Sequence, residues 1–389
     1  MNWRFFRLWP PLFALSWLFS PCLTPAAKAE AMEVRVLVVE SAPQLTISSP
    51  TALRLSGCTP SSLPQTLAPE QRVTIAYDPS GLRVGGHKAE GHKALLVQTD
   101  PGSYLRLNGR SYRGAIEVYR SSGRESLLAI NVVDLEDYLR GVIKEEISPQ
   151  WPAEALKAQA VVARTFALRQ ILDNPQQLFH LRATTDSQLY GGRESEDYRC
   201  DLAVEQTRGM VLTLKGKPIP AFYHAACGGH TEDVGNVWSY NHSSLQGVPC
   251  SYCQEYPVYA WQVALSRQEV RRSLLRAGYE VGEVEAILPL ARSKTERILQ
   301  LEIRHRGGRI VMEGTRFRRI LGNDLIRSTN FSVKYAGDSF IFQGKGWGHG
   351  VGLCQWGTKG MAERGFSYQS ILYHYYPGAT LKPLEGIED

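Results

Sequence analysis

The stretch Asp134-Leu-Glu-Asp-Tyr-Leu-Arg-Gly-Val-Ile-Lys-Glu-Glu-Ile147 predicts an amphipathic helix that carries a carboxylate on its apolar side. Asp134 suits the N-cap position, and acidic residues follow it in the first turn. The apolar residues form one stripe at helical spacing: Leu135, Leu139, Val142 and Ile143. Glu146 comes 11, 7, 4 and 3 residues after them, so it falls on the same stripe, whereas Glu145 lies off it and is expected to be solvated.

A carboxylate in this position has two interpretations. Burial is unfavourable for the charged form and raises the pKa of the carboxyl towards neutrality. A carboxyl that is still protonated near neutral pH can act as a general acid, so Glu146 is a candidate catalytic residue. The alternative is a structural glutamate at a helix end, ion-paired with an arginine such as Arg164.

The first 29 residues of the 389-residue chain have the pattern of a secretory signal. Arg4 and Arg7 precede an apolar stretch, and Ala27-Lys-Ala29 resembles a signal-peptidase site. The apolar stretch is too short to span a bilayer comfortably, and prolines interrupt it. We therefore expect an exported protein of the periplasm or cell envelope, without a membrane span in the mature chain.

Composition favours an ordinary globular protein, with 43% apolar and 21% charged residues. Cleavage of the signal would remove three of the 44 basic residues and none of the 38 acidic ones, which lowers the net charge from +6 to +3. This excess is too small to indicate nucleic acid as a partner.

Short alternating apolar runs between turn residues predict a β-rich region over residues 30–130. From residue 131 to 382 helical and strand patterns mix, with a second helix after Pro152 and strand patterns over residues 298–343. Residues 264–335 read as an inserted small β/α subdomain. The predicted fold class is α+β: a β-rich N-terminal region followed by a mixed α/β catalytic domain with an insertion.

Two short-spaced ligand pairs, His224-x-x-Cys227 and Cys250-x-x-Cys253, lie 22 residues apart. Such pairs are typical of a closed, structural zinc site, so zinc is the expected cofactor and no organic cofactor is expected. His230 could replace His224 as the fourth ligand. In an exported protein the alternative is a disulfide from Cys227 to Cys250 or Cys253. Three further cysteines have no partner that the sequence identifies: Cys58, Cys200 and Cys354.

Two loops could bind sugars. Thr184–Gly192 contains hydrogen-bonding side chains and an aromatic ring, which makes Ser187, Gln188 and Tyr190 candidate substrate contacts, although many surface turns look similar. Gly344–Gly357 has glycine at alternate positions and lacks the spacing of a phosphate-binding loop. Its candidate contacts are Trp347, His349 and Gln355, and the alternative is a tight structural corner.

These motifs together resemble the stage II sporulation protein D family. The resemblance rests on Tyr138–Ile147, Trp151–Ala167, Ser187–Gly191, His224–Gly229 and Gly346–Gly357, and it extends from about Asn131 to Leu381. The family includes lytic transglycosylases that cleave peptidoglycan strands stripped of peptides, and relatives described as amidase enhancers. The resemblance implies that Glu146 is the catalytic glutamate, although Ile147-Ser-Pro149 replaces the Met-Pro pair that follows it in many members.

The expected activity is lytic transglycosylation with a single carboxyl as acid and base, and glycan strands are the expected substrate. Glu146 and Arg164 stand among the candidate site residues, Arg164 as a substrate contact. Three alternatives remain open: a non-catalytic wall-binding enhancer of an amidase, a hydrolase that uses Asp186 as a second carboxylate, and a zinc hydrolase.

Overall fold

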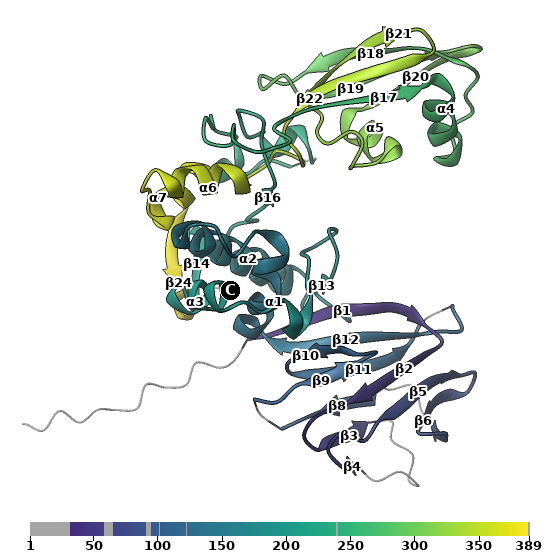
Figure 1. The fold of residues 1–389 in the computed structure, drawn as a ribbon, viewed down its shortest axis with the longest axis vertical. Coiled ribbons are helices and arrows are strands. Elements are labelled where there is room, and N and C mark those ends of the chain that lie inside the picture. Colours follow the sequence, from purple (N-terminus) through teal and green to yellow (C-terminus); the bar gives the residue numbers. More distant parts are fainter. Residues whose placement is uncertain are drawn as a thin grey trace, which may run out of the picture. The chain divides into compact units, whose positions relative to one another are not determined.

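The computed structural model describes residues 32–57, 65–90, 95–100, 102–121, 123–238 and 240–387 (Figure 1). The predicted signal, residues 1–29, and Cys58 lie outside the described residues. Within the described ranges β-sheets predominate before residue 135, and helices and sheets mix after it, so the predicted α+β class is confirmed. No helix in these ranges is both long and apolar enough to cross a lipid bilayer.

Two sheets build the β-rich N-terminal region, as the alternating pattern predicts. The first has the order β13-β1-β12-β11-β8-β3-β4, with bounds Leu181–Arg182, Glu33–Ala42, Leu127–Asp134, Ala115–Arg120, Leu95–Gln98, Leu53–Gly57 and Thr66–Leu67. The second has the order β10-β9-β2-β5-β6-β7, with bounds Arg110–Tyr112, Leu105–Leu107, Gln44–Ser48, Val73–Asp78, Gly81–Val84 and His87–Glu90. Their inward-facing apolar side chains share one core.

Three helices continue this core. They are α1 (Leu135–Glu146), α2 (Ala153–Asp173) and α3 (Tyr198–Gln206). The side chain of Asp134 caps α1 by accepting hydrogen bonds from the backbone N–H groups of Glu136 and Asp137, as predicted. The predicted domain boundary at residue 130 falls inside β12, which pairs with β1 and leads directly into α1. The β-rich region and the first helices therefore share a single apolar interior.

A second core surrounds the glycine-rich loop and the cysteines. It combines one sheet of β15-β14-β24 (Lys217–Pro218, Met210–Leu214, Thr380–Pro383) with the parallel pair β16 (Tyr223–His224) and β23 (Leu353–Cys354). Helices α6 (Gln355–Glu363) and α7 (Tyr368–Tyr375) pack here, together with short 3-10 turns at Val234–Asn236 and Ser243–Leu245. Two further 3-10 turns, Gly192–Ser195 and Leu384–Gly386, lie against the first core.

The inserted segment has a core of its own. One sheet has the order β17-β22-β21 (Ala260–Ser266, Ser339–Lys345, Phe331–Ala336), and the other β18-β19-β20 (Val284–Arg292, Ile298–His305, Gly308–Glu313). Helices α4 (Arg267–Arg276) and α5 (Gly314–Leu321) pack against them. The pairing of Ala260 with Lys345 extends this segment beyond the predicted 264–335.

A candidate active-site groove at the end of helix α1

Glu146 lines an open groove of about 730 Å³ at the C-terminal end of α1. The groove wall combines segments that lie far apart in the sequence: the loop before Tyr190, strand β16, the glycine-rich loop and helix α5. Its lining includes Glu146, Phe166, Asp186, Ser187, Leu189, Phe222, Tyr223, His224, Trp238, Arg318, Asn323, Asp324, Trp347, His349 and Gln355. Four of the predicted substrate contacts thus share a groove with Glu146: Ser187, Trp347, His349 and Gln355.

The carboxyl of Glu146 is held by three hydrogen-bond donors. The backbone N–H of Leu189 donates to Oε1 at 3.0 Å, and Nε2 of Gln355 donates to Oε2 at 3.4 Å. The hydroxyl of Tyr223 also donates to it. Burial raises the pKa of Glu146 above its ordinary value of 4.5, and the three donors act in the opposite direction because they favour the carboxylate. No ion pair involves Glu146 among the described residues, so the alternative of a simple salt bridge is not supported.

A chain of buried hydrogen bonds orients Tyr223. Tyr138 donates to Oε1 of Gln188 at 3.1 Å, and Nε2 of Gln188 donates to the Tyr223 oxygen at 3.1 Å. The Tyr223 hydrogen is therefore left for Glu146. Gln188 is fully buried, so its predicted role as a substrate contact was wrong: it acts through Tyr223. Tyr223 itself was not predicted.

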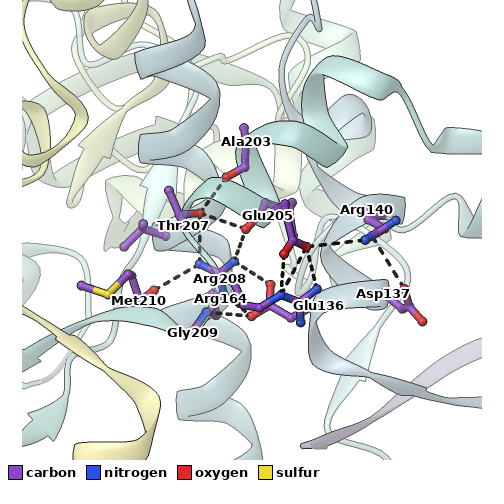
Figure 2. Close-up of polar contacts among 12 residues, drawn as sticks. Glu136, Asp137, Arg140, Arg164, Ala203, Glu205, Thr207, Arg208, Gly209 and Met210 are labelled. Atoms are coloured by element: carbon purple, nitrogen blue, oxygen red, sulfur yellow. Dashed lines mark hydrogen bonds and ion pairs between the residues drawn. The ribbon is translucent and has the colours of Figure 1, made fainter. Parts of the chain in front are cut away.

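Arg164 lies in the protein interior and not in the groove. Its guanidinium is fully buried and makes a bidentate ion pair with Glu136, with Nε–Oε1 at 2.8 Å and Nη2–Oε2 at 2.7 Å. It also donates to the carbonyl oxygen of Met210 (Figure 2) and to that of Val204. The predictions of Arg164 as a substrate contact, or as a partner of Glu146, were therefore wrong.

The loop before Tyr190 divides between core and groove. Tyr190 is only 4% exposed, donates its hydroxyl to Oδ1 of Asn131 at 2.8 Å and packs against Tyr138. It is a core residue, which corrects the predicted sugar-stacking role. Ser187 lines the groove, and its Oγ accepts a hydrogen bond from the backbone N–H of Arg182. Asp186, the alternative second carboxylate, is exposed at the groove rim.

The glycine-rich loop approaches other backbone and side chains so closely that larger residues would not fit. Gly348 has φ +116°, and a Cβ there would lie 2.7 Å from Cβ of His224. Gly350 has φ +90°, and its Cβ would lie 2.6 Å from the guanidinium carbon of Arg297. These positions need glycine for both conformation and space. The loop can therefore bring Trp347 and His349 to the groove wall.

The two histidines of the groove, His349 and His224, differ in whether a ring nitrogen remains without a hydrogen-bond partner. His349 donates from Nε2 to the carbonyl oxygen of Tyr223 and accepts at Nδ1 from the N–H of Val351, so both nitrogens are used. Burial lowers its pKa to about 3, which keeps the ring neutral. His224 is 5% exposed, and its Nδ1 lies 3.1 Å from the carbonyl oxygen of Val351. Its Nε2 has no partner among the described residues.

Four buried cysteine sulfurs gather beneath the loop. Those of Cys227, Cys250, Cys253 and Cys354 all lie within 4.8 Å of one another, and no described cysteine forms a disulfide. This corrects the predicted ligand set of His224, Cys227, Cys250 and Cys253: the parallel pairing of β16 with β23 brings Cys354 to the cluster, while His224 bonds to Val351. His230, the predicted substitute, lies outside the cluster, and its Nδ1 is 2.6 Å from the carbonyl oxygen of Thr231.

A buried arginine accompanies the sulfurs. Arg297 is 1% exposed and donates from Nη2 to the carbonyl oxygen of Cys227 at 2.6 Å. Burial lowers its pKa, and negative charge on Cys227 opposes that effect. No carboxylate forms an ion pair with Arg297 among the described residues, and the negative charges that act on it are those of Cys227 and Glu232, followed by Cys354 and Cys253.

Several residues of this region were missed because no local pattern marks them. Tyr223 stands in an ordinary short strand, Cys354 is 101 residues from Cys253, and Arg318 belongs to a helix in the insertion. Only the pairing of distant strands and the packing of the insertion bring them together.

Two protein-family models match separate parts of the chain, one around α1 and α2 and one over the inserted segment. A family model described as Stage II sporulation protein matches residues 123–214, which contain α1, α2 and Glu146. A second model, described as a domain of unknown function, matches residues 249–352, which contain the inserted segment.

Full-length comparison finds relatives over most of the chain. An uncharacterized protein of Brachyspira hyodysenteriae is 35% identical over 80% of this chain and 82% of its own length. The stage II sporulation protein D of Bacillus amyloliquefaciens is 27% identical over 75% of this chain and 88% of its own. The amidase enhancer of Bacillus subtilis is 30% identical over 71% of this chain and 45% of its own.

Proposed function

The chain belongs to the stage II sporulation protein D family, and from this premise we propose that it is an exported peptidoglycan lytic transglycosylase with Glu146 as its acid and base. The names of its relatives support a function related to the cell wall. The observation that carries the proposal is the carboxyl of Glu146, which has a raised pKa, opens onto the groove and is oriented by three donors.

The reaction needs one carboxyl. Protonated Glu146 donates its proton to the glycosidic oxygen between N-acetylmuramic acid and N-acetylglucosamine, and the C1–O bond breaks. The resulting carboxylate then takes the proton of the muramic C6 hydroxyl while that oxygen bonds to C1. The product ends in a 1,6-anhydro ring, and Glu146 is protonated again. Leu189, Gln355 and Tyr223 would stabilise the intermediate carboxylate through their hydrogen bonds.

Substitution of Glu146 tests the acid role. Glu146→Gln removes the proton at nearly constant volume, so glycan cleavage should fall by about 10²–10⁴-fold while glycan binding remains. The matched control is Glu145→Gln, which alters the adjacent, exposed carboxylate. A Glu146→Gln enzyme within about threefold of wild type would show that another group supplies the proton.

Product analysis separates the proposal from its alternatives. Cleavage in ¹⁸O-labelled water should give 1,6-anhydromuramic ends without label at C1, as seen by mass spectrometry. Labelled reducing ends would indicate hydrolysis, with Asp186 as the first candidate base because it lines the same groove. Absence of any cleavage, with stimulation of a cell-wall amidase, would support the enhancer function that the Bacillus subtilis relative's name describes.

We also propose that the four cysteines hold a structural zinc ion. A tetrahedral site with Zn–S bonds of about 2.3 Å places its sulfurs about 3.8 Å apart, and the observed cluster is compatible with that spacing. Four thiolates around Zn²⁺ carry net negative charge, which buried Arg297 would compensate. With four protein ligands no coordination position is left for water, so the ion would stabilise the loop and take no part in the reaction.

A further inference from the structure

An arginine from the inserted segment faces the groove with two free guanidinium nitrogens. Arg318 on α5 donates from Nε to the carbonyl oxygen of Ile326 at 2.8 Å, which fixes the guanidinium. Among the described residues Nη1 and Nη2 have no hydrogen-bond or ion-pair partner, and neither is a fully buried, unpartnered atom. Both nitrogens are therefore accessible to solvent, on a residue that lines the groove.

The charge of this guanidinium is poorly compensated. Burial lowers the pKa of Arg318 to about 10, so it remains a cation near neutral pH. Asp324 is the acid that acts on it, but no ion pair of 4.0 Å or less joins the two. The positive charge of Arg318 also lowers the pKa of His349, which lines the same groove. A partly desolvated cation without a counter-ion favours an anionic ligand.

Buried hydrogen bonds fasten the inserted segment to the site. The N–H of Gly348 donates to the carbonyl oxygen of Arg327 at 2.8 Å, and Nη2 of Arg297 donates to that of Cys227 at 2.6 Å. On the other side Glu232 accepts hydrogen bonds from the hydroxyls of Ser293 and Thr295. These contacts join the inserted segment to the region around the groove, and Arg318 of α5 is one of the lining residues.

We propose that the inserted segment forms one wall of the glycan groove and that Arg318 binds a carboxylate of the bound strand there. The inference rests on the proposed peptidoglycan substrate and gives the insertion a role in recognising it. The two free Nη groups suit bidentate binding of a carboxylate. Peptidoglycan offers carboxylates of two kinds: the lactyl group of muramic acid where no peptide is attached, and the side chains and ends of stem peptides.

Binding measured in a Glu146→Gln background tests this without catalysis. The probes are a peptide-free muramic-acid oligosaccharide, the same oligosaccharide with its lactyl carboxyl converted to a methylamide, and a peptide-bearing one. Arg318→Gln should weaken binding of at least one carboxylate-bearing probe by roughly 10- to 100-fold, the effect of losing charge-assisted hydrogen bonds. Loss confined to the peptide-free acid identifies the lactyl carboxylate, and loss confined to the peptide-bearing probe identifies the stem peptide.

The adjacent Arg319 provides a matched control, because it is an exposed arginine on the same helix. Arg319→Gln should leave all three affinities unchanged. Asp324→Asn should act in the opposite direction and tighten carboxylate binding by roughly two- to fivefold, since it removes a competing negative charge. If Arg318→Gln does not fold, the carboxylate affinity of Asp324→Asn tests the inference by itself.

Equal affinities of the Arg318→Gln and parent proteins for every probe would overturn the inference, as would an equal loss in Arg319→Gln. Neither result depends on whether the enzyme is a lyase. The failure of the proposed function would appear instead as cleavage by the Glu146→Gln protein or as labelled products.

Discussion

At Glu146, burial and hydrogen bonding act on the pKa in opposite directions. Burial raises it, and the donors Leu189, Tyr223 and Gln355 lower it. A general acid must be protonated before reaction and must tolerate the charge after it, so both influences are useful. The rate should therefore be high below the raised pKa and should fall as pH increases through it.

Removal of one donor should shift this alkaline limit in a defined direction. Tyr223→Phe removes a hydrogen bond that favours the carboxylate, so the pKa of Glu146 should rise and the limit should move to higher pH. Gln355→Leu should shift it the same way. The measurement is kcat/KM for glycan cleavage against pH.

Glu145→Gln should shift the alkaline limit of kcat/KM in the opposite direction. The negative charge of Glu145 raises the pKa of Glu146, so its removal should move the limit slightly to lower pH. If all three variants moved the limit in one direction, a general effect on folding or binding would explain the profiles better than titration of Glu146.

At the scale of elements, one ion pair joins the helices that position the site. Arg164 on α2 meets Glu136 on α1, and it also bonds to carbonyl oxygens at the end of α3 and the start of β14. Glu136 in turn accepts a hydrogen bond from the N–H of Gly209 at 3.0 Å. Helix α1, which ends at Glu146, is thus anchored by a buried network at its first turn.

Breaking this pair from one side should destabilise the protein strongly. Arg164→Met leaves Glu136 buried without its cationic partner, so the free energy of unfolding should fall by about 3–5 kcal/mol. The double variant Arg164→Met/Glu136→Leu should recover much of that loss, since no charge remains unpaired. Urea denaturation measures both.

The KM and glycan affinity of folded Arg164→Met distinguish a structural role of Arg164 from the role as a substrate contact that the sequence predicts. Folded Arg164→Met should bind glycan with nearly wild-type affinity, because the guanidinium does not reach the groove. A large rise in KM at unchanged stability would restore Arg164 as a substrate contact.

The elements that the sequence predicts well are those with local signals. Helix α1 has an N-cap and an apolar stripe, α2 follows Pro152, and the strands before residue 130 alternate regularly. Helix α6 was missed because its start, Gln355, follows a run of glycines that reads as a turn. Helix α5 was missed among strand patterns, since only its packing in the insertion stabilises it.

A site residue could be predicted only where the sequence pattern of its own segment identifies it. Glu146 could be located from its own helix, whereas Tyr223, Arg318 and Cys354 depend on contacts between distant segments. The same limit explains the errors: Gln188 and Tyr190 have suitable chemistry for sugars, but tertiary packing uses them inside the protein. Local sequence specifies which groups are present and not which of them reach the surface.

At the scale of the whole molecule, the cysteine cluster connects three regions of the chain to the carboxyl of Glu146. It joins the loop after β16, the segment around Cys250 and Cys253, and the N-cap of α6. Cys354 directly precedes Gln355, whose amide donates to Glu146. Loss of a bound metal should therefore affect catalysis indirectly, through the position of Gln355.

Metal content and stability should identify the ligand set. We expect one zinc per chain by elemental analysis, and both Cys250→Ser and Cys354→Ser should lower zinc content and Tm, because each removes a ligand from a closed shell. His224→Ala and Cys200→Ala should retain the metal, since neither side chain belongs to the cluster.

Retention of zinc by Cys354→Ser together with its loss from His224→Ala would instead support the ligand set predicted from the sequence. Metal-free protein with a disulfide mapped among these cysteines would exclude both sets. Because His224 lies at the groove and Cys354 beneath the loop, this pair of variants also distinguishes a metal next to the substrate from one that only holds the loop in place.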